Sequence, residues 1–387
     1  MSAPSDTLSH GVGRLLPTYP PAEITIVRGE GARVWDIDGT EYLDFGAGIA
    51  VVSLGHGHPA PLAAARAQLD SLWHASNLYR TEPVEKLAVQ LSERFGGAGA
   101  FFCNSGTEAV EAALKYARKA TGRPGVVALD GGFHGRTLGS LSATGQPAKR
   151  EPFAPLVPGV RFVSPNDLEG LREAVDDGVG LILLEPILGE GGVLPLDAEF
   201  VAAARGLPAL LCLDEVQTGI GRTGSFFAFE QLGVCPDLVT LAKGLANGLP
   251  IGALLVADGA AGGFAPGDHG STFGGNPVAC AAAGAVVDAI DDELLENVRE
   301  QGAVLAEGLA SLPGVADVRG RGLLLGASVD RPASEVVTAC RERGLLVLTA
   351  GDDVVRLAPP LTIGLEDVEQ ALTVLAAALR ARRCISC

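Results

Sequence analysis

Short runs of apolar residues alternate with amphipathic segments from about residue 100 to residue 257. Within residues 104–120 the apolar positions recur at helical spacing, which predicts a helix directly after the first apolar run. Continuous apolar strands separated by helices indicate a mostly parallel sheet that is covered on both faces. The seven runs that we expect to form strands are AFFC, GVVAL, RFV, GLILLEP, ALLCLDE, LVTLAKG and GALLVA. We therefore predict an α/β fold with its chemistry at the carboxyl ends of these strands.

The segments on either side of this region carry different patterns. Residues 31–45 alternate apolar and polar positions around the turn DIDGT, which predicts a β-hairpin. From residue 276 to about residue 312 we expect one long helix, followed by short strands and a last helix that form a smaller α+β unit. The hairpin should dock beside this unit. The predicted parts are an N-terminal segment that belongs to the small domain (1–48), a large domain (49–275) and a C-terminal small domain (276–387).

Composition and charge narrow the class of protein. The chain has 387 residues, of which 47% are hydrophobic and 19% charged, as in globular proteins. A formal net charge of −17 argues against nucleic acid or an anionic membrane as the main partner. The first 17 residues lack the pattern of a signal peptide, and the run VACAAAGAVV is too short to cross a bilayer.

Cysteine usage favours a reducing compartment. The seven cysteines follow no framework spacing, which suits the cytosol. The single CxxC, formed by Cys384 and Cys387, is interpreted as an unimportant tail and not as a metal or redox site.

Lys243 lies between two apolar runs and has glycines on its C-terminal side. A lysine at the end of a strand often extends its stem until the amine reaches water. The alternative is a desolvated amine with a lowered pKa, which can condense with a carbonyl as a Schiff base. The neighbouring residues alone leave both interpretations open.

Two other segments place polar groups at a strand end. Ser105, Gly106 and Thr107 join a strand to a helix, where backbone N–H groups and two hydroxyls suit a phosphate, or else form an ordinary N-cap. Asp214 ends the run ALLCLD, where it either accepts a hydrogen bond from a cationic ring nitrogen or caps the strand end. A P-loop nucleotidase is excluded because the motif GxxxxGK[ST] does not occur.

The segment DGGFHGRT offers a carboxylate site. Arg136 in this Gly-rich loop suits a carboxylate fork, although a surface charge is the alternative. Phe133 and His134 beside it are compatible with core packing or a polar turn. His56 and His58 of LGHGHP lack acidic or cysteine neighbours, so a structural turn is favoured over a metal site.

Taken in order, these segments resemble the class III (ornithine-type) aminotransferases, which are pyridoxal-phosphate enzymes of fold-type I. The resemblance extends from about Tyr19 to Leu361 and is greatest to members that act on N-acetylornithine. It implies a large domain with a mostly parallel seven-stranded sheet plus a smaller α+β domain. The motifs that carry it are GHGHP, NSGTEAVEAALKYAR, FHGRT, EPILGEGGV, LDEVQTGIGRTG, LAKGLANGLPIGA, HGSTFGGNP and VVRLAPPL.

The resemblance implies how the cofactor is held. Lys243 would bind the cofactor aldehyde as a Schiff base and later act as general acid–base. Asp214 would keep the pyridine nitrogen protonated, Gln217 would bind the phenolic side and Phe133 would stack on the ring. The other cofactor contacts implied are Ser105, Gly106 and Thr107 at the phosphate, Glu215 and Val216 beside Asp214, and Thr272 from the neighbouring subunit of a homodimer.

The resemblance also implies substrate contacts. Arg136 resembles a carboxylate-binding arginine, and Ser271 and Tyr19 match substrate-contacting residues. Arg356 matches the arginine that receives the α-carboxylate of glutamate or 2-oxoglutarate. Glu190 matches the glutamate that pairs with this arginine while the ω-amino donor reacts; a solvated loop charge is the alternative.

Single positions bear on the choice of amine donor. Ile49 stands where ornithine aminotransferases have tyrosine, and an apolar side chain there suits an acylated α-amino group, although GABA-type members also carry isoleucine. The sequence departs from the family pattern at two positions that we expect to lie away from the reacting atoms. Val110 replaces an asparagine, and AVVSLGH lacks the asparagine of AVNALGH. We expect modest effects from both.

We therefore expect a cytoplasmic, homodimeric, pyridoxal-phosphate-dependent ω-aminotransferase that needs no metal. The expected ping-pong reaction moves the terminal amino group of N2-acetylornithine to 2-oxoglutarate, giving N-acetylglutamate 5-semialdehyde and glutamate, a step of arginine biosynthesis. Ornithine, succinylornithine, acyl-lysine and GABA are alternative donors. A catalytically silent scaffold and a cofactor-free Schiff-base lyase are disfavoured because Lys243, Asp214 and Thr107 are all present.

Overall fold

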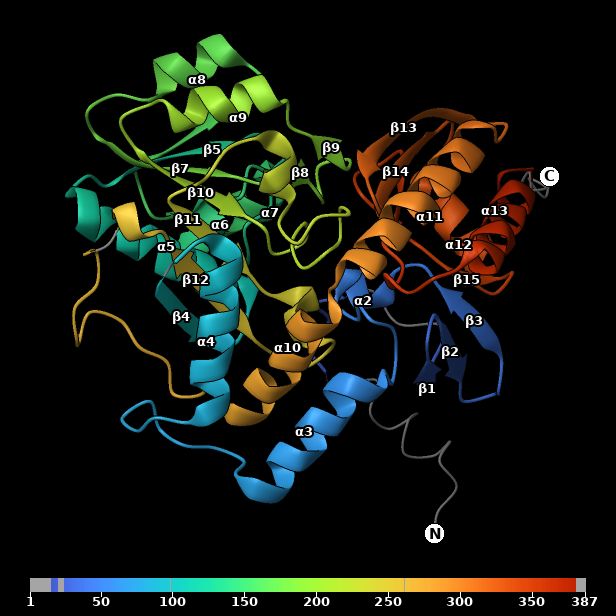
Figure 1. Ribbon diagram of the computed structural model, residues 1–387. Helices are drawn as coiled ribbons and strands as arrows, with labels where there is room; N and C mark the ends of the chain where they lie inside the picture. Colours follow the sequence, from blue (N-terminus) through green and yellow to red (C-terminus); the bar gives the residue numbers. More distant parts are fainter. Residues whose placement is uncertain (1–14, 20–23, 98, 261, 381–387) are drawn as a thin grey trace.

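The computed structural model describes residues 15–19, 24–97, 99–260 and 262–380, so the start of the chain and the CxxC of Cys384 and Cys387 lie outside the described residues (Figure 1). A seven-stranded sheet forms its larger part, in the order β4-β12-β11-β10-β7-β5-β6. The strands are β4 (Gly99–Cys103), β5 (Gly125–Leu129), β6 (Val160–Val163), β7 (Val179–Leu184), β10 (Leu210–Asp214), β11 (Leu238–Leu241) and β12 (Gly252–Val256).

The sheet is mostly parallel, as the apolar runs predict. Strand β10 is parallel to both β11 and β7, and β5 is parallel to both β7 and β6. Strand β12 is antiparallel to both of its neighbours, β11 and β4. Every residue of β7 is buried, because helices cover both faces of the sheet. The α/β fold and its seven-stranded, mostly parallel sheet are thus confirmed.

Alternate residues of the central strands enter two different cores. On one face, Leu181 and Leu183 pack with residues of helix α5 (Gly106–Thr121). One of these is Val110, which replaces the asparagine of the family pattern. On the other face, Ile182 and Leu184 belong to the larger core. The other helices of this part are α4 (Glu82–Phe95), α6 (Leu138–Ser142), α7 (Pro147–Arg150), α8 (Leu168–Ala174) and α9 (Ala198–Arg205), with short β8 (Ile187–Leu188) and β9 (Leu194–Pro195) paired to each other.

The C-terminal part contains a second, antiparallel sheet in the order β13-β14-β17-β16. Its strands are β13 (Val315–Arg321), β14 (Leu324–Val329), β16 (Leu348–Thr349) and β17 (Val354–Leu357), packed with α11 (Asp292–Ala310), α12 (Ala333–Arg341) and α13 (Leu365–Arg380). Figure 1 shows these elements in orange and red beside the larger sheet.

The predicted hairpin is present as β2 (Arg33–Asp36) and β3 (Glu41–Asp44), preceded by β1 (Ile26–Glu30). Strand β15 (Leu345–Leu346) pairs with β3 in parallel, with Leu345 opposite Leu43. The N-terminal strands and a strand from the C-terminal part therefore share one sheet.

The expectation of one long helix from residue 276 to residue 312 is wrong. Helix α10 (Pro277–Ala289) ends at Ile290, whose ψ of 79° leaves the helical region, and α11 begins after Asp291. The Asp291 carboxylate accepts a hydrogen bond from the N–H of Leu294 at 2.9 Å, as an N-cap does. Helix α10 packs instead against α4 and α3 (Pro59–Ser71). The break contains neither glycine nor proline, so the apolar pattern conceals it.

Arg222 connects the two sheets. It lies in the loop after β10, is buried, and donates hydrogen bonds to the carbonyl oxygens of Leu323 and Pro359. These carbonyls lie just before β14 and just after β17. None of the described helices is long and apolar enough to cross a bilayer.

Candidate active site

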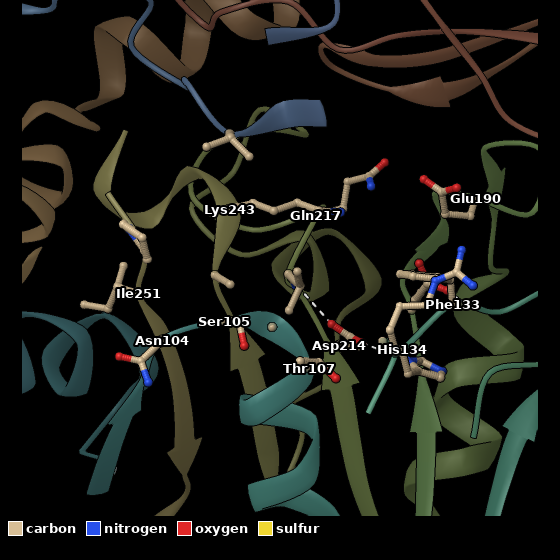
Figure 2. Close-up of a pocket in the computed structure, with 18 of the residues that line it drawn as sticks. Asn104, Ser105, Thr107, Phe133, His134, Glu190, Asp214, Gln217, Lys243 and Ile251 are labelled. Atoms are coloured by element: carbon tan, nitrogen blue, oxygen red, sulfur yellow. Dashed lines mark hydrogen bonds and ion pairs between the residues drawn. The ribbon is translucent and has the colours of Figure 1, made fainter. Parts of the chain in front are cut away.

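A cavity of about 390 Å³ opens at the carboxyl ends of β10 and β11 (Figure 2). This is the edge at which the parallel strands predict the chemistry. The structure brings to it the expected residues Ser105, Gly106, Thr107, Phe133, Arg136, Glu190, Asp214, Val216, Gln217 and Lys243.

Asp214 is the last residue of β10, and three groups hold its carboxylate. Oδ2 lies 2.7 Å from Nδ1 of His134, while Oδ1 accepts hydrogen bonds from the hydroxyl of Thr240 at 3.0 Å and the N–H of Val216 at 3.1 Å. Burial alone would lower the pKa of His134, but the hydrogen bond and charge of Asp214 raise it above its ordinary value. The carboxylate is thus fixed in orientation beside an imidazole whose proton it stabilises.

Lys243 follows β11 at the first residue of a 3-10 turn, η3 (Lys243–Ala246), and its backbone has a φ of 40°. Such left-handed backbone is rare for a residue with a side chain and is often found at functional sites. Figure 2 shows the side chain extending among the pocket residues. Burial, together with the charge of Arg356, lowers the pKa of Lys243 to about 8. The amine is therefore far more nucleophilic near neutral pH than an ordinary lysine.

Gly244, directly after Lys243, allows the turn to pack closely against Ser53. A Cβ on Gly244 would lie 2.9 Å from Oγ of Ser53, and this hydroxyl donates a hydrogen bond of 2.7 Å to the Gly244 carbonyl. The turn that carries the lysine is thereby held against the segment around Ser53.

Helix α5 begins at the pocket with the segment Ser105-Gly106-Thr107. The Ser105 hydroxyl caps the helix, 3.4 Å from the N–H of Glu108. A Cβ on Gly106 would lie 2.8 Å from Cγ1 of Val216, so only glycine fits there without a shift. The Thr107 hydroxyl lies 2.6 Å from that of Ser140. The N-cap interpretation is confirmed, and the same three residues line the cavity.

Glu185, which sequence reasoning missed, supports two loops of the pocket. One carboxylate oxygen accepts the N–H of Phe133 at 2.8 Å, and the other accepts the N–H of Gly189 at 3.2 Å. Burial raises the pKa of Glu185 to about 7, with the nearby charge of His134 opposing this shift. In the sequence, Glu185 only marks the end of an apolar strand, and no motif around it indicates a role in the pocket.

Arg356 and Glu190 form an ion pair, with 2.6 Å between Nη1 and Oε1. The same nitrogen of Arg356 donates to the Gly189 carbonyl at 3.0 Å and to Oε1 of Gln217 at 3.1 Å. Burial would raise the pKa of Glu190, but the charge and hydrogen bond of Arg356 hold it below its ordinary value. Glu190 lines the pocket, whereas Arg356 is 3% exposed and does not.

Glu215 is placed differently from the expectation. Its carboxylate points away from the pocket and accepts the N–H groups of Ala228 and Phe229, each at 2.9 Å, and the hydroxyl of Thr218 at 2.8 Å. Burial raises the pKa of Glu215 to about 7. Its side chain therefore anchors the start of η2 (Ala228–Leu232) and does not line the cavity.

Besides Arg356 and Glu215, four expected residues lie outside the cavity of the single chain. The Ser271 hydroxyl is 3.3 Å from the side-chain amide of Asn104, which does line the cavity. Thr272 is exposed on the same loop. Tyr19 and Ile49 are 81% and 44% exposed.

The histidines of LGHGHP have structural contacts. Nε2 of His56 lies 2.8 Å from the Asp44 carboxylate, and the His58 ring caps helix α3 through the N–H of Ala60. Within the described ranges, no group of three or more histidine, cysteine or acidic side chains is arranged to hold a metal ion.

Comparison with known proteins agrees with this geometry. The chain is 51% identical to acetylornithine aminotransferase of Streptomyces coelicolor, over 94% of this chain and 92% of the relative. It is 49% identical to the Corynebacterium efficiens enzyme of the same name, over 97% of each chain. Succinylornithine transaminase of Yersinia enterocolitica is 44% identical, over 94% of each chain.

Solved structures give the same result. A crystal structure of ornithine aminotransferase from Toxoplasma gondii, with PLP partially occupying its active site, superposes with a TM-score of 0.91 at 33% identity, covering 98% of this chain and 95% of the other. The family model for class-III aminotransferases matches residues 17–379. The fold, the pocket and these matches together show that the chain belongs to the class-III aminotransferase family.

Proposed function

We propose that the protein is a pyridoxal-phosphate-dependent aminotransferase that moves the terminal amino group of N2-acetylornithine to 2-oxoglutarate. The products are N-acetylglutamate 5-semialdehyde and glutamate. The observation that carries the proposal is the pairing, in one cavity, of a lysine with lowered pKa and an aspartate held by a histidine. The relatives at about half identity over nearly the whole chain support the choice of donor.

The cavity fits pyridoxal phosphate by the chemistry of its lining groups. The N-terminus of α5 with Ser105, Gly106 and Thr107 would hold the phosphate through N–H groups and hydroxyls. Asp214 would pair with the ring nitrogen, and Lys243 would bind the aldehyde. We propose four further contacts with the cofactor: Phe133 at the ring face, Val216 and Gln217 beside Asp214, and Thr272 from a second subunit.

When bound, pyridoxal phosphate withdraws electrons from the substrate carbon and carries the amino group from donor to acceptor. The protein supplies proton transfer and orientation. Lys243 Nζ would take a proton from the substrate carbon and return it, since burial already lowers the pKa of this amine to about 8 in the cofactor-free protein. The Asp214 carboxylate would stabilise a proton on the ring nitrogen, and the contact with His134 would keep that carboxylate in place.

Arg136, Glu190 and Arg356 would handle two different substrates in one cavity. Arg136 lines the cavity and would bind a carboxylate of each substrate. While the amine donor reacts, Glu190 would cover Arg356, as it does in the structure. For 2-oxoglutarate or glutamate, Glu190 would leave Arg356 to the substrate's α-carboxylate.

The proposal also specifies that the amine donor carries an acetyl group on its α-amino nitrogen. Ile49 lies outside the cavity of its own chain; the resemblance places it at the donor's α-amino group, where an apolar side chain would favour an acylated donor. Initial rates with N-acetylornithine, N-succinylornithine, ornithine and GABA, measured side by side, test this choice. A clear preference for ornithine or GABA would overturn the donor and leave the cofactor proposal intact.

We further propose a homodimer in the cytoplasm. The loops that contain Trp73 and Thr272 are joined, since the Asn276 side chain donates to the Trp73 carbonyl at 2.9 Å. They present large exposed rings, with Trp73 71%, Tyr79 74% and Phe273 62% exposed. Large exposed rings on two joined loops support a protein–protein contact there. Such a contact would place Thr272 at the cavity of a second copy.

Borohydride reduction followed by peptide mapping tests the cofactor proposal directly. We expect a pyridoxyl mass on Lys243 in the cofactor-loaded protein. The same mass on a different lysine, or its absence from fully loaded protein, would refute the assignment.

A further inference from the structure

Lys149 approaches Glu190 on the side that Arg356 does not occupy. Its Nζ lies 3.8 Å from Oε2 of Glu190, while Oε1 lies 2.6 Å from Arg356. The two oxygens of one carboxylate therefore face two different cations. The function proposed above assigns no role to Lys149.

The position of the Lys149 amine is defined by its surroundings. Nζ lies 4.8 Å above the ring of Phe133, close enough for a cation–π contact. Burial lowers the pKa of Lys149, and the charges of Arg136 and Arg356 add to this shift, whereas Glu190 opposes it. The side chains of Lys149 and Glu190 are 27% and 25% exposed, so the pair is only partly screened by water.

Arg356 does not depend on Glu190 to stay in place. It also binds the Gly189 carbonyl and the Gln217 side chain, at 3.0 and 3.1 Å. Among the residues that the structure describes, the partners given for the Glu190 carboxylate are Arg356 and Lys149. If it left Arg356 without meeting another cation, a largely buried carboxylate would remain unpaired, which is costly.

We propose that Lys149 is the alternative partner of Glu190: when a substrate carboxylate takes Arg356, Glu190 moves onto Lys149. This inference rests on the proposed function and adds a positioning residue to it. No bond is made or broken; one ion pair replaces another. Lys149 thus lowers the cost of opening the site for 2-oxoglutarate and glutamate, and leaves the donor half-reaction, in which Glu190 stays on Arg356, almost unchanged.

The test uses the holoenzyme and the variant Lys149→Met, which keeps the length of the stem without its charge. Glutarate is the probe, because it is a dicarboxylate with no amino or keto group, and its binding is measured by calorimetry. We expect K149M to weaken glutarate binding about fivefold, the effect of losing one partly exposed ion pair. The half-saturating glutamate concentration should rise equally in single-turnover reactions, while that of N-acetylornithine should change less than about twofold.

Two further variants serve as controls. Lys149→Arg should restore glutarate affinity, since it returns the cation. Arg150→Met removes a charge from the same short helix, but Arg150 lies over Phe162, 4.1 Å from its ring centroid, and should leave affinity unchanged.

A double variant separates this role from direct substrate binding. In a Glu190→Gln background there is no carboxylate to relocate, so adding K149M should have no further effect on glutarate affinity. A K149M effect that persists in this background, an equal loss for N-acetylornithine, or no K149M effect at all would each overturn the inference. A wild-type protein that binds glutarate in this Lys149-dependent way but does not turn over N-acetylornithine would instead refute the proposed donor.

Discussion

At the scale of single residues, the orientation of Asp214 depends on its neighbours. His134, Thr240 and Val216 each contribute a contact to its two oxygens. A carboxylate held in this way needs no reorganisation when charge develops on a ring nitrogen beside it. The imidazole is itself buried, at 3% exposure, so its contact with Asp214 is poorly replaced by water.

The first prediction follows from this contact. Replacing His134 by phenylalanine keeps a ring in the site but removes the group opposite Oδ2. We expect kcat with N-acetylornithine to fall about tenfold to a hundredfold, the cost of one hydrogen bond to a charged group. His134→Gln, whose amide can donate to Asp214, should recover part of the loss. Steady-state kinetics of both variants decide this, and an unchanged kcat in H134F would count against the role.

The second prediction concerns the pKa of about 8 of Lys243 in cofactor-free protein. Only the neutral amine attacks the cofactor aldehyde, so below pH 8 the rate of cofactor capture should fall about tenfold per pH unit. Above pH 8 the rate should level off, whereas an ordinary lysine would still gain reactivity up to about pH 10. Stopped-flow absorbance during reconstitution measures this dependence. A rate that keeps rising beyond pH 9 would show that the amine is not desolvated.

The residues that sequence reasoning found and missed differ in a physical way. Lys243 and Asp214 end apolar strands, and the family motifs single them out. The partner of Asp214 is 80 positions away in the chain, and its contact exists only because β5 and β10 are brought together by β7. Glu185 bonds to Phe133 across 52 positions for the same reason. Contacts of this kind depend on the order of strands in the sheet, which local patterns do not encode.

At the scale of elements, the start of α5 packs tightly against the loop after β10. A Cβ at Gly106 would lie 2.8 and 2.9 Å from the two γ-carbons of Val216. The helix terminus that would hold the phosphate is therefore positioned by contact with the loop that would hold the ring.

The third prediction uses this contact. Gly106→Ala should separate helix and loop by a few tenths of an ångström and weaken cofactor binding about tenfold, with little change in folding. Val216→Ala removes both clashing carbons, so the double variant G106A/V216A should recover most of the affinity for the cofactor. Cofactor dissociation constants from fluorescence titration give the comparison. Equal affinities for G106A and the wild type would mean that the helix start has room to move.

Elements were predicted best where burial is complete. The strands of the large sheet are continuous apolar runs because both of their faces are covered, and all seven were expected. The break between α10 and α11 was missed because apolar spacing continues through Ile290, and only the backbone turn and the Asp291 cap reveal it. Glu215 was assigned to the cavity with its neighbours, although adjacent residues at a strand end point in opposite directions.

At the scale of the whole molecule, the cavity is incomplete in one chain if Thr272 acts from a second copy. The exposed rings on the loops of residues 72–81 and 271–276 indicate where that copy would dock.

The fourth prediction is a complementation between two inactive variants. K243A lacks the amine, and Thr272→Asp would repel the phosphate of the other subunit's site. In a hybrid dimer both defects fall in one site, and the other site has Lys243 from one chain and Thr272 from its partner. Random mixing should therefore restore about a quarter of the wild-type activity. If Thr272 served its own chain's site, both sites of the hybrid would stay defective, and mixing would restore nothing.

The buried guanidinium of Arg222 has a consequence for how two substrates share one cavity. Arg222, in the loop after β10, binds the backbone just before β14 and just after β17, which is one end of this antiparallel strand pair, and β17 carries Arg356. Asp214, which we propose to face the cofactor nitrogen, and Arg356, which we propose to bind the acceptor, are thus linked through one buried arginine. A rocking motion of one lobe against the other would break these two hydrogen bonds, so we expect the rotation of the Glu190 side chain to distinguish donor from acceptor.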